Sequence, residues 1–122
     1  MRAVEEIAAA SAEKRPLFMY CSWPDPHHPF TPPGAYWERY DPSDIPLPET
    51  FDDPHENAMP HYLNMIANRG YQVGRRVNGW APTEEQYRHA AAAEYGMISL
   101  IDDGVGAIFK ALDQRGLDRL AG

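Results

Sequence analysis

The stretch Leu17-Phe-Met-Tyr-Cys-Ser-Trp-Pro-Asp-Pro-His-His-Pro-Phe-Thr-Pro-Pro33 decides what fold this chain can adopt. Residues 17–22 form a nearly continuous apolar run between Pro16 and Pro24. A short run of this kind is typical of a strand covered on both faces, as in a parallel sheet. Because a central strand does not accept proline, the expected strand ends by Trp23. The sequence therefore predicts a buried strand over 17–22, followed by a loop.

The loop after this expected strand is stiff and presents two histidines, His27 and His28. Each proline fixes its own φ angle and restricts the residue before it, so the loop has little freedom to lose on binding. The prolines concerned are Pro24, Pro26, Pro29, Pro32 and Pro33. In open α/β sheets, ligands bind just beyond the carboxyl ends of the strands. The loop is therefore the first candidate for a functional site.

Helices are predicted on both sides of this stretch. Residues 2–13 are rich in alanine and glutamate, with apolar residues at helical spacing. A longer helix is predicted over 84–115, because Thr83 and Gln86 form a capping box and Gly116 is placed as its C-cap. Its expected apolar stripe contains Tyr87, Ala91, Tyr95, Ile98, Ile101, Val105, Ile108 and Leu112.

Residues 34–82 show little regular pattern, apart from one helical turn expected at 36–40 and another at about 60–68. A structureless loop of this length is unusual inside a compact domain. We interpret the region as a proline-rich excursion on the substrate side of a larger protein. The chain as a whole, 1–122, is expected to form a single partial domain.

Composition narrows the functional classes. The net charge is −7 and no basic run is present, which argues against nucleic acid and anionic membranes as partners. The single cysteine, Cys21, excludes an internal disulfide framework. No apolar run approaches the length of a membrane span and no secretory signal is visible, so the sequence leaves localisation open.

Two separated motifs resemble one family. The first is Pro24-Asp-Pro-His-His-Pro-Phe-Thr-Pro-Pro33 with the tyrosine- and tryptophan-containing segment 36–42, and the second is Tyr95-Gly-Met-Ile-Ser-Leu-Ile-Asp-Asp103 followed by residues 112–117. In order and spacing they resemble the middle of a sulfatase, over residues 15–118. Sulfatases are the formylglycine-dependent branch of the alkaline phosphatase superfamily.

The resemblance assigns a role to the histidine loop. His27 lies in a His-x-Pro pattern, and in sulfatases that histidine contacts the sulfate group and assists the leaving oxygen. A protonated imidazole can donate to an anionic oxygen, which makes the role chemically sound. The alternative is a loop histidine bonded to backbone carbonyls. For His28, two interpretations stay open: it binds substrate, or it packs between the prolines.

Other residues of types that can act in catalysis or metal binding are predicted to have structural roles. Cys21 lies in Cys-Ser-Trp-Pro-Asp, whereas the formylglycine cysteine of sulfatases lies in Cys-x-Pro-Ser-Arg, so we expect Cys21 to be a small buried apolar residue. Asp102 and Asp103 are adjacent on a helix and do not match the family's metal ligands, so no metal site is expected in this chain. His55, His61 and His89 are expected to be surface groups.

The sequence therefore predicts an α/β chain with a partial sulfatase-like fold: one buried strand, an N-terminal helix, a long proline-rich region and a long C-terminal helix. The expected function is that of a piece of a sulfuric ester hydrolase, inactive alone, whose parent uses formylglycine and a divalent cation, usually calcium. The alternatives are a phosphonate or phosphate ester hydrolase of the same superfamily, or a non-catalytic interaction module. An unpaired strand edge also predicts a homo-oligomer, formed by strand pairing or helix exchange.

Overall fold

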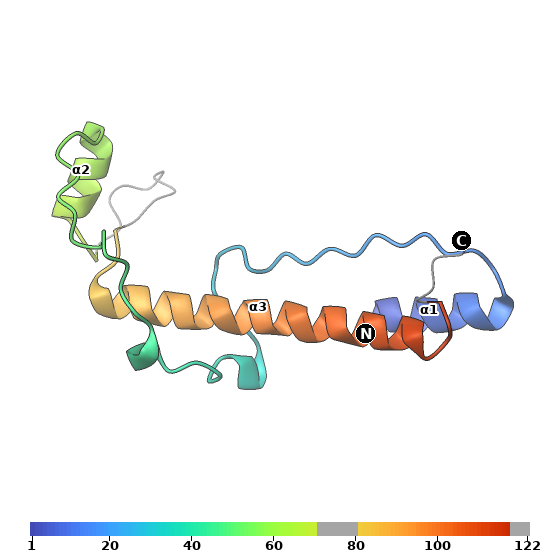
Figure 1. The fold of residues 1–122 in the computed structure, drawn as a ribbon. Helices are drawn as coiled ribbons and strands as arrows, with labels where there is room; N and C mark the ends of the chain where they lie inside the picture. The colour runs from blue at the N-terminus through green and yellow to red at the C-terminus, as the bar shows by residue number, and fades with distance from the viewer. Residues whose placement is uncertain (71–80, 118–122) are drawn as a thin grey trace.

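The fold is built along one helix, α3 (Glu84–Asp113), which is 30 residues long. The computed structural model describes residues 1–70 and 81–117. Three elements pack against α3: the helix α1 (Arg2–Glu13) and the short 3-10 helices η1 (Gly34–Tyr36) and η2 (Pro42–Asp44). Figure 1 shows α1 beside the C-terminal half of α3, and α2 (Pro60–Ala67) near its start. Residues 71–80 of the expected irregular region and 118–122 of the expected domain lie outside the described residues.

The ends of the helices follow the sequence signals. The side chain of Thr83 accepts a hydrogen bond from the Gln86 amide at 3.2 Å, and the Gln86 side chain accepts one from the Thr83 amide at 2.9 Å. This capping box satisfies amides that the first turn of a helix leaves without partners. At the other end, Gly116 adopts a positive φ of 64° and the Leu117 amide donates to the Leu112 carbonyl at 3.0 Å. The predictions of both long helices and of α2 are confirmed.

The prediction of an α/β fold with a buried strand at 17–22 is wrong. No strand is present in residues 1–70 and 81–117, and residues 15–24 run extended along the helices without a neighbouring strand. Side chains alternate along this segment: Leu17, Met19 and Cys21 are half-buried, whereas Phe18 is 95% exposed and Tyr20 is 84% exposed. An apolar run becomes a buried strand only when other strands pair with its edges and other layers cover both faces. Within the described residues the helices cover one face only.

The apolar stripe expected on α3 is only partly covered within the described residues. Tyr95 and Ile98 are 43% and 47% exposed, although both belong to that stripe. The residues that α3 buries are small or flexible instead, and they are Ala92, Ala93, Gly96, Met97 and Ala111. The spacing of large apolar residues defines a face of a helix. Which face is buried depends on the elements that pack against it, and here these approach along the small residues.

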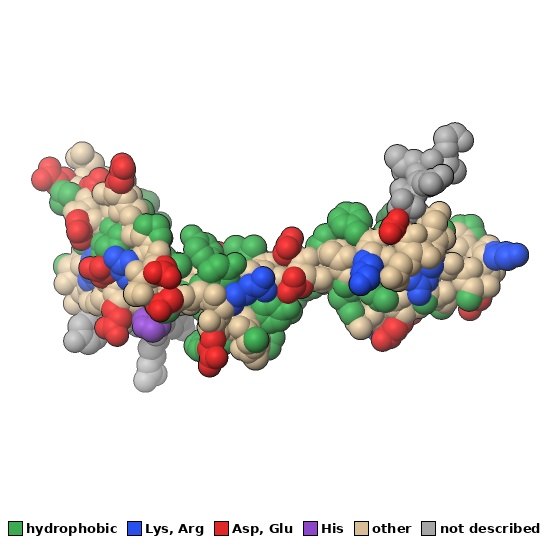
Figure 2. Space-filling view, turned by 60° about the horizontal axis from the view of Figure 1, so that its bottom comes forward, with side chains coloured by type: hydrophobic (Ala, Val, Ile, Leu, Met, Phe, Trp, Pro, Cys, Tyr) green, Lys and Arg blue, Asp and Glu red, His purple; other side chains and the backbone are tan. Residues whose placement is uncertain are grey.

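The buried core of the described residues is small. It consists of Ile7 and Ala10 on α1, Ile45 after η2, and Ala92, Ala93, Met97 and Ala111 on α3. Large apolar side chains remain on the surface in several places, and Figure 2 shows them as green areas between the charged groups. None of the helices in the described ranges combines the length and apolar character that a membrane span requires.

Two segments pack closely where η1 lies against α3 at Gly96. A Cβ atom placed on Gly96 would collide with the backbone carbonyl oxygen of Tyr36 and would lie 3.1 Å from Cγ of Pro32. Because the obstacle is backbone, a side chain at this position cannot be accommodated by a rotamer change. Gly96 therefore sets how closely the segment 32–36 lies on α3.

We predict that Gly96→Ala destabilises the chain by about 1–3 kcal/mol, the usual cost of overpacking, despite alanine's better helix propensity. Urea unfolding followed by far-UV circular dichroism measures the change. The matched control is Gly106→Ala on the same helix, where no other part of the described chain packs within 4 Å of the added methyl group. That variant should gain about 0.5–1 kcal/mol. Similar effects from both substitutions would show that η1 does not press on α3.

Candidate functional site

The histidine loop is exposed and its two rings stack on each other. The ring centroids of His27 and His28 are 4.1 Å apart, with planes inclined by 29°. The amide of His27 donates to the carbonyl of Pro24 at 3.2 Å, which closes a turn before the histidines. Both side chains are exposed, so the loop presents imidazole edges to its surroundings. His28 therefore packs against the ring of His27, and not only against the neighbouring prolines.

A hydrogen bond selects one tautomer of His27. Its Nδ1 lies 2.7 Å from the backbone carbonyl oxygen of His28. Since a carbonyl oxygen can only accept, Nδ1 carries the proton and donates it. The other ring nitrogen, Nε2, is then the one through which His27 can act on a ligand. The sequence left open that His27 only bonds a backbone carbonyl. That hydrogen bond is present, and it uses Nδ1 and not Nε2.

The segment after the loop is fastened to α3 by side-chain hydrogen bonds. The hydroxyl of Tyr36 donates to Oδ2 of Asp103 at 2.8 Å, and Nη1 of Arg39 lies 3.4 Å from the same oxygen. This hydrogen bond, together with desolvation, raises the pKa of Tyr36 above its usual value. The Tyr40 hydroxyl lies 2.8 Å from Oγ of Ser99. Asp103 thus accepts the hydrogen bonds that join Tyr36 and Arg39 to α3.

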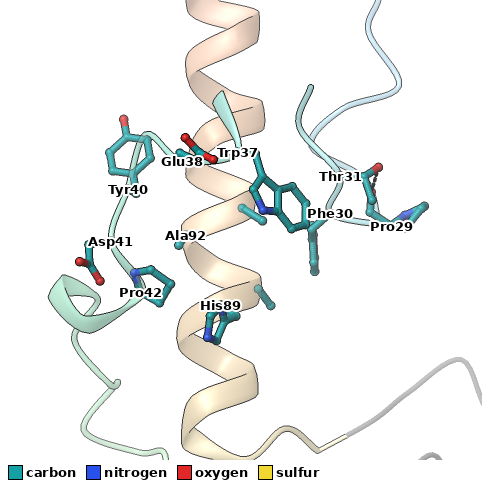
Figure 3. Close-up of a pocket in the computed structure, with 12 residues that line it drawn as sticks. Pro29, Phe30, Thr31, Trp37, Glu38, Tyr40, Asp41, Pro42, His89 and Ala92 are labelled. Carbon is teal, nitrogen blue, oxygen red and sulfur yellow. Dashed lines mark hydrogen bonds between the residues drawn. The ribbon is translucent and has the colours of Figure 1, made fainter. Parts of the chain in front are cut away.

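A cavity of about 590 Å³ lies between this fastened segment, the end of the histidine loop and α3. Its described lining consists of Pro29, Phe30, Thr31, Trp37, Glu38, Tyr40, Asp41, Pro42, His89, Ala90, Ala92 and Ala93. Figure 3 shows Trp37 and Phe30 on one side of α3 and Tyr40 and Asp41 on the other. Small-molecule sites are typically about 300–1,000 Å³ and largely apolar, so the cavity has the dimensions of a binding site.

Asp41 at the cavity wall is held in its ionised form. Its Oδ1 accepts hydrogen bonds from the amide and the hydroxyl of Ser43, at 2.8 Å and 2.7 Å. These two hydrogen bonds lower the pKa of the Asp41 carboxyl below its usual value, and the one from the Ser43 amide has the larger effect. The cavity therefore carries a fixed negative charge at neutral pH.

Several curated proteins are similar to this chain, and three of them are described here. A multifunctional alkaline phosphatase superfamily protein, PehA, of Trinickia caryophylli is 30% identical over 107 residues, which is 84% of this chain and 21% of PehA. An arylsulfatase of Clostridium perfringens is 30% identical over 84% of this chain and 19% of its own length. A choline-sulfatase of Rhizobium meliloti is 26% identical over 81% of this chain and 18% of its own length.

The chain belongs to the sulfatase family. It spans about a fifth of the length of the curated relatives it matches. No family model matches the chain, and no solved structure matches it. The helical fold of the described residues is therefore known from this structure alone, whereas family membership is known from sequence similarity.

The described residues do not fit the cofactors of a sulfatase. Cys21 is half-buried on the extended segment and lies in Cys-Ser-Trp-Pro-Asp, which is not a formylglycine motif. Within 1–70 and 81–117, no three side chains of His, Cys, Asp or Glu come together as a metal site. Asp25, a carboxylate near the histidine loop, has no such partners there.

Sequence reasoning missed the cavity beside the histidine loop. His89 was expected to be a surface group, and it is exposed, but it also lines this cavity together with Asp41. The sequence placed Trp37 and Tyr40 in an expected helical turn and in the motif that resembles sulfatases, but not at a binding site. The signal that could have found the site is the density of aromatic and acidic residues in Tyr36-Trp-Glu-Arg-Tyr-Asp41, directly after the histidine loop.

We predict that the Asp41 carboxyl titrates below 3.8, the ordinary value of an aspartate. Because the folded-state pKa is lowered, the stabilisation is present above the unfolded-state pKa and is lost as pH falls through the folded-state pKa. Carboxyl NMR titration measures the pKa. Comparison of acid unfolding with Asp41→Asn isolates the stability effect, since the variant should lack this part of the acid dependence.

The matched control is Asp44→Asn, which removes a carboxylate from the same turn without touching the hydrogen bonds of Ser43. In that variant the Asp41 titration should persist. An Asp41 pKa at or above the ordinary value would contradict the hydrogen-bonded turn.

Proposed function

We propose that this chain is the middle segment of the catalytic domain of a sulfate ester hydrolase, and that it contributes the histidine that assists the leaving group. The observation that carries the proposal is the geometry of His27: an exposed ring whose Nδ1 is fixed on a backbone carbonyl, leaving Nε2 available. Family membership supports the reaction class, because two of the similar proteins are named as sulfatases.

The proposed role of His27 is proton donation. When a nucleophile bonds to sulfur and the bond between sulfur and the ester oxygen breaks, negative charge develops on that oxygen. A protonated imidazole donates its Nε2 proton to the oxygen, and the leaving group departs as a neutral alcohol. The hydrogen bond from Nδ1 to the His28 carbonyl holds the ring in one orientation, and stacking on His28 restricts it further. For His28 we propose contact with substrate through the same stacked pair.

The substrate class has a near alternative. A phosphonate or phosphate ester requires the same assistance at its leaving oxygen, and one similar protein is named as a multifunctional member of the alkaline phosphatase superfamily. Comparison of kcat/KM for matched aryl sulfate and aryl phosphate substrates would separate the two, because both esters release the same alcohol.

We predict that His27→Ala lowers turnover by about 10²-fold or more in a longer polypeptide that joins this sequence to the nucleophile and metal-ligand motifs of the family. The physical reason is the loss of a positioned proton donor at the leaving oxygen. The effect should be largest for alcohols that are poor leaving groups and smallest for acidic phenols. Turnover of a series of aryl and alkyl sulfates measures it.

The control for this experiment is His61→Ala, which removes an exposed histidine far from the loop in sequence. Its effect on turnover should be small. The 122-residue chain by itself should not hydrolyse aryl sulfates, because its sequence contains no Cys-x-Pro-Ser-Arg nucleophile motif. Equal losses from both histidine variants, or an effect independent of the leaving group, would contradict the assigned role.

Self-association is a second proposal, which applies to the chain studied alone. Large apolar side chains are exposed on the extended segment and on α3: Phe18 by 95%, Tyr20 by 84% and Phe109 by 65%. Monomeric proteins rarely leave such surface uncovered when it forms a continuous patch. Burial of these side chains between copies would remove them from water. This is the homo-oligomer expected from the sequence, formed here through side chains.

We predict that the 122-residue chain is a dimer or larger oligomer at micromolar concentration. Size-exclusion chromatography with light scattering measures the mass, and Phe18→Ser with Phe109→Ser should shift it towards that of the monomer. The surface variant Ala12→Ser, which changes an exposed small residue, should not. A monomer of unchanged mass across concentrations would refute the proposal.

A further inference from the structure

We propose that the cavity beside the histidine loop binds a small organic cation, an alkylated ammonium group. This cavity is the 590 Å³ space between α3, residues 29–31 and residues 37–42. The aromatic lining and the carboxylates of the cavity suit such a cation, whether or not the chain takes part in ester hydrolysis. The test of the proposal is a binding measurement, so its failure and the failure of the proposed function are distinguishable.

The walls of the cavity are aromatic and aliphatic. Trp37 and Phe30 form one side and Tyr40 belongs to the other, over a floor that includes Ala92, which is 4% exposed. Trp37 is 55% exposed, so a substantial part of its ring is open to a ligand. Aromatic faces attract cations electrostatically, and such rings are the common recognition element for quaternary ammonium groups.

The charges at the cavity have one sign. Glu38 and Asp41 line it, and its described lining contains no Lys or Arg. The nearest arginines in sequence point to other partners. Arg39 pairs with Asp103, and Arg88 pairs with Glu84 at 2.9 Å and donates to the carbonyl of Ile45.

His89 is the one lining residue that can carry a positive charge. It opposes a cation only when its ring is protonated. Asp41 stays ionised because of its hydrogen bonds to Ser43. Figure 2 shows acidic side chains gathered over the end of the molecule that holds the start of α3. The cavity therefore repels anions and favours a cation.

The aromatic walls are held in place before any ligand arrives. The Tyr40 hydroxyl lies 2.8 Å from Oγ of Ser99, and its ring meets Tyr95 edge to face at 5.6 Å. The close approach of η1 to Gly96 fixes the segment from which Trp37 and Glu38 follow. A site with fixed walls loses little conformational entropy on binding.

The chemistry favours an alkylated ammonium over a primary one. A primary ammonium is compact and strongly hydrated, and it needs acceptors for its N–H groups. An alkylated ammonium spreads its charge over methyl groups, which can contact ring faces directly. Since most of the lining is apolar, the alkylated cation loses less hydration on entry.

The test uses the 122-residue chain and three small probes: tetramethylammonium, neutral tert-butanol of matching size, and the smaller primary cation methylammonium. Two-dimensional NMR follows the indole N–H of Trp37, with sodium chloride added to keep ionic strength constant. Tetramethylammonium should shift this signal saturably and bind at least about tenfold more tightly than tert-butanol. Methylammonium should bind more weakly than tetramethylammonium.

Variants assign the binding to these residues. Trp37→Ala should abolish saturable binding, whereas Trp37→Phe should retain part of it. Glu38→Gln changes only charge at nearly constant shape and should weaken binding several-fold. Glu49→Gln is the matched control, because it removes an exposed carboxylate that does not line the cavity. It should leave binding unchanged.

Two results would overturn the proposal. The first is equal affinity for tetramethylammonium and tert-butanol, which would leave an apolar hollow without cation selectivity. The second is an equal loss from Glu38→Gln and Glu49→Gln, which would indicate attraction to the overall charge of the chain. Circular dichroism of Trp37→Ala should match the parent chain, since this side chain is more than half exposed, and the two glutamine variants decide the outcome if it does not.

Discussion

The approach of the Tyr36 backbone to Gly96 is the contact on which the site depends. Only a residue without Cβ lets the segment 32–36 lie this close to α3. From that point the chain continues into Trp37, Glu38, Tyr40 and Asp41, so the position of η1 determines where these side chains stand. Gly96 belongs to the motif that resembles sulfatases. Packing alone is a sufficient physical reason for glycine there.

The two proposed sites of the chain have opposite electrostatic demands. The histidine loop is suited to an anionic oxygen, because an imidazole edge can donate to it. The neighbouring cavity carries two carboxylates and repels an anion. A ligand that combined an anionic ester with a cationic organic part would satisfy both demands. This arrangement would also keep the anionic group out of the cavity and direct it towards the histidines.

Much apolar surface stays exposed in the described residues, because the core is small and the segment 15–24 is covered on one face only. Alternate side chains of the segment contact the helices, and the others face outward. Such a segment buries only part of the apolar surface that its composition offers. The same imbalance holds on α3, where Tyr95, Ile98 and Phe109 remain exposed while small residues are buried. Additional protein surface, from any source, would be stabilising on these faces.

Local signals in the sequence determined the helices, their caps and the family. Capping of α3 by Thr83 and Gln86 involves residues three apart, and the αL conformation of Gly116 is a property of glycine itself, so both could be predicted. His27 could be found as a candidate because its motif is contiguous. Three features could not be predicted from the sequence, because each depends on which distant segments meet. They are the burial of 17–22, the buried face of α3, and the cavity around Trp37 and His89. The alternation at Phe18 and Tyr20 and the contact at Gly96 were decided by tertiary packing alone, since sequence pattern specifies what a residue can bury but not what is present to cover it.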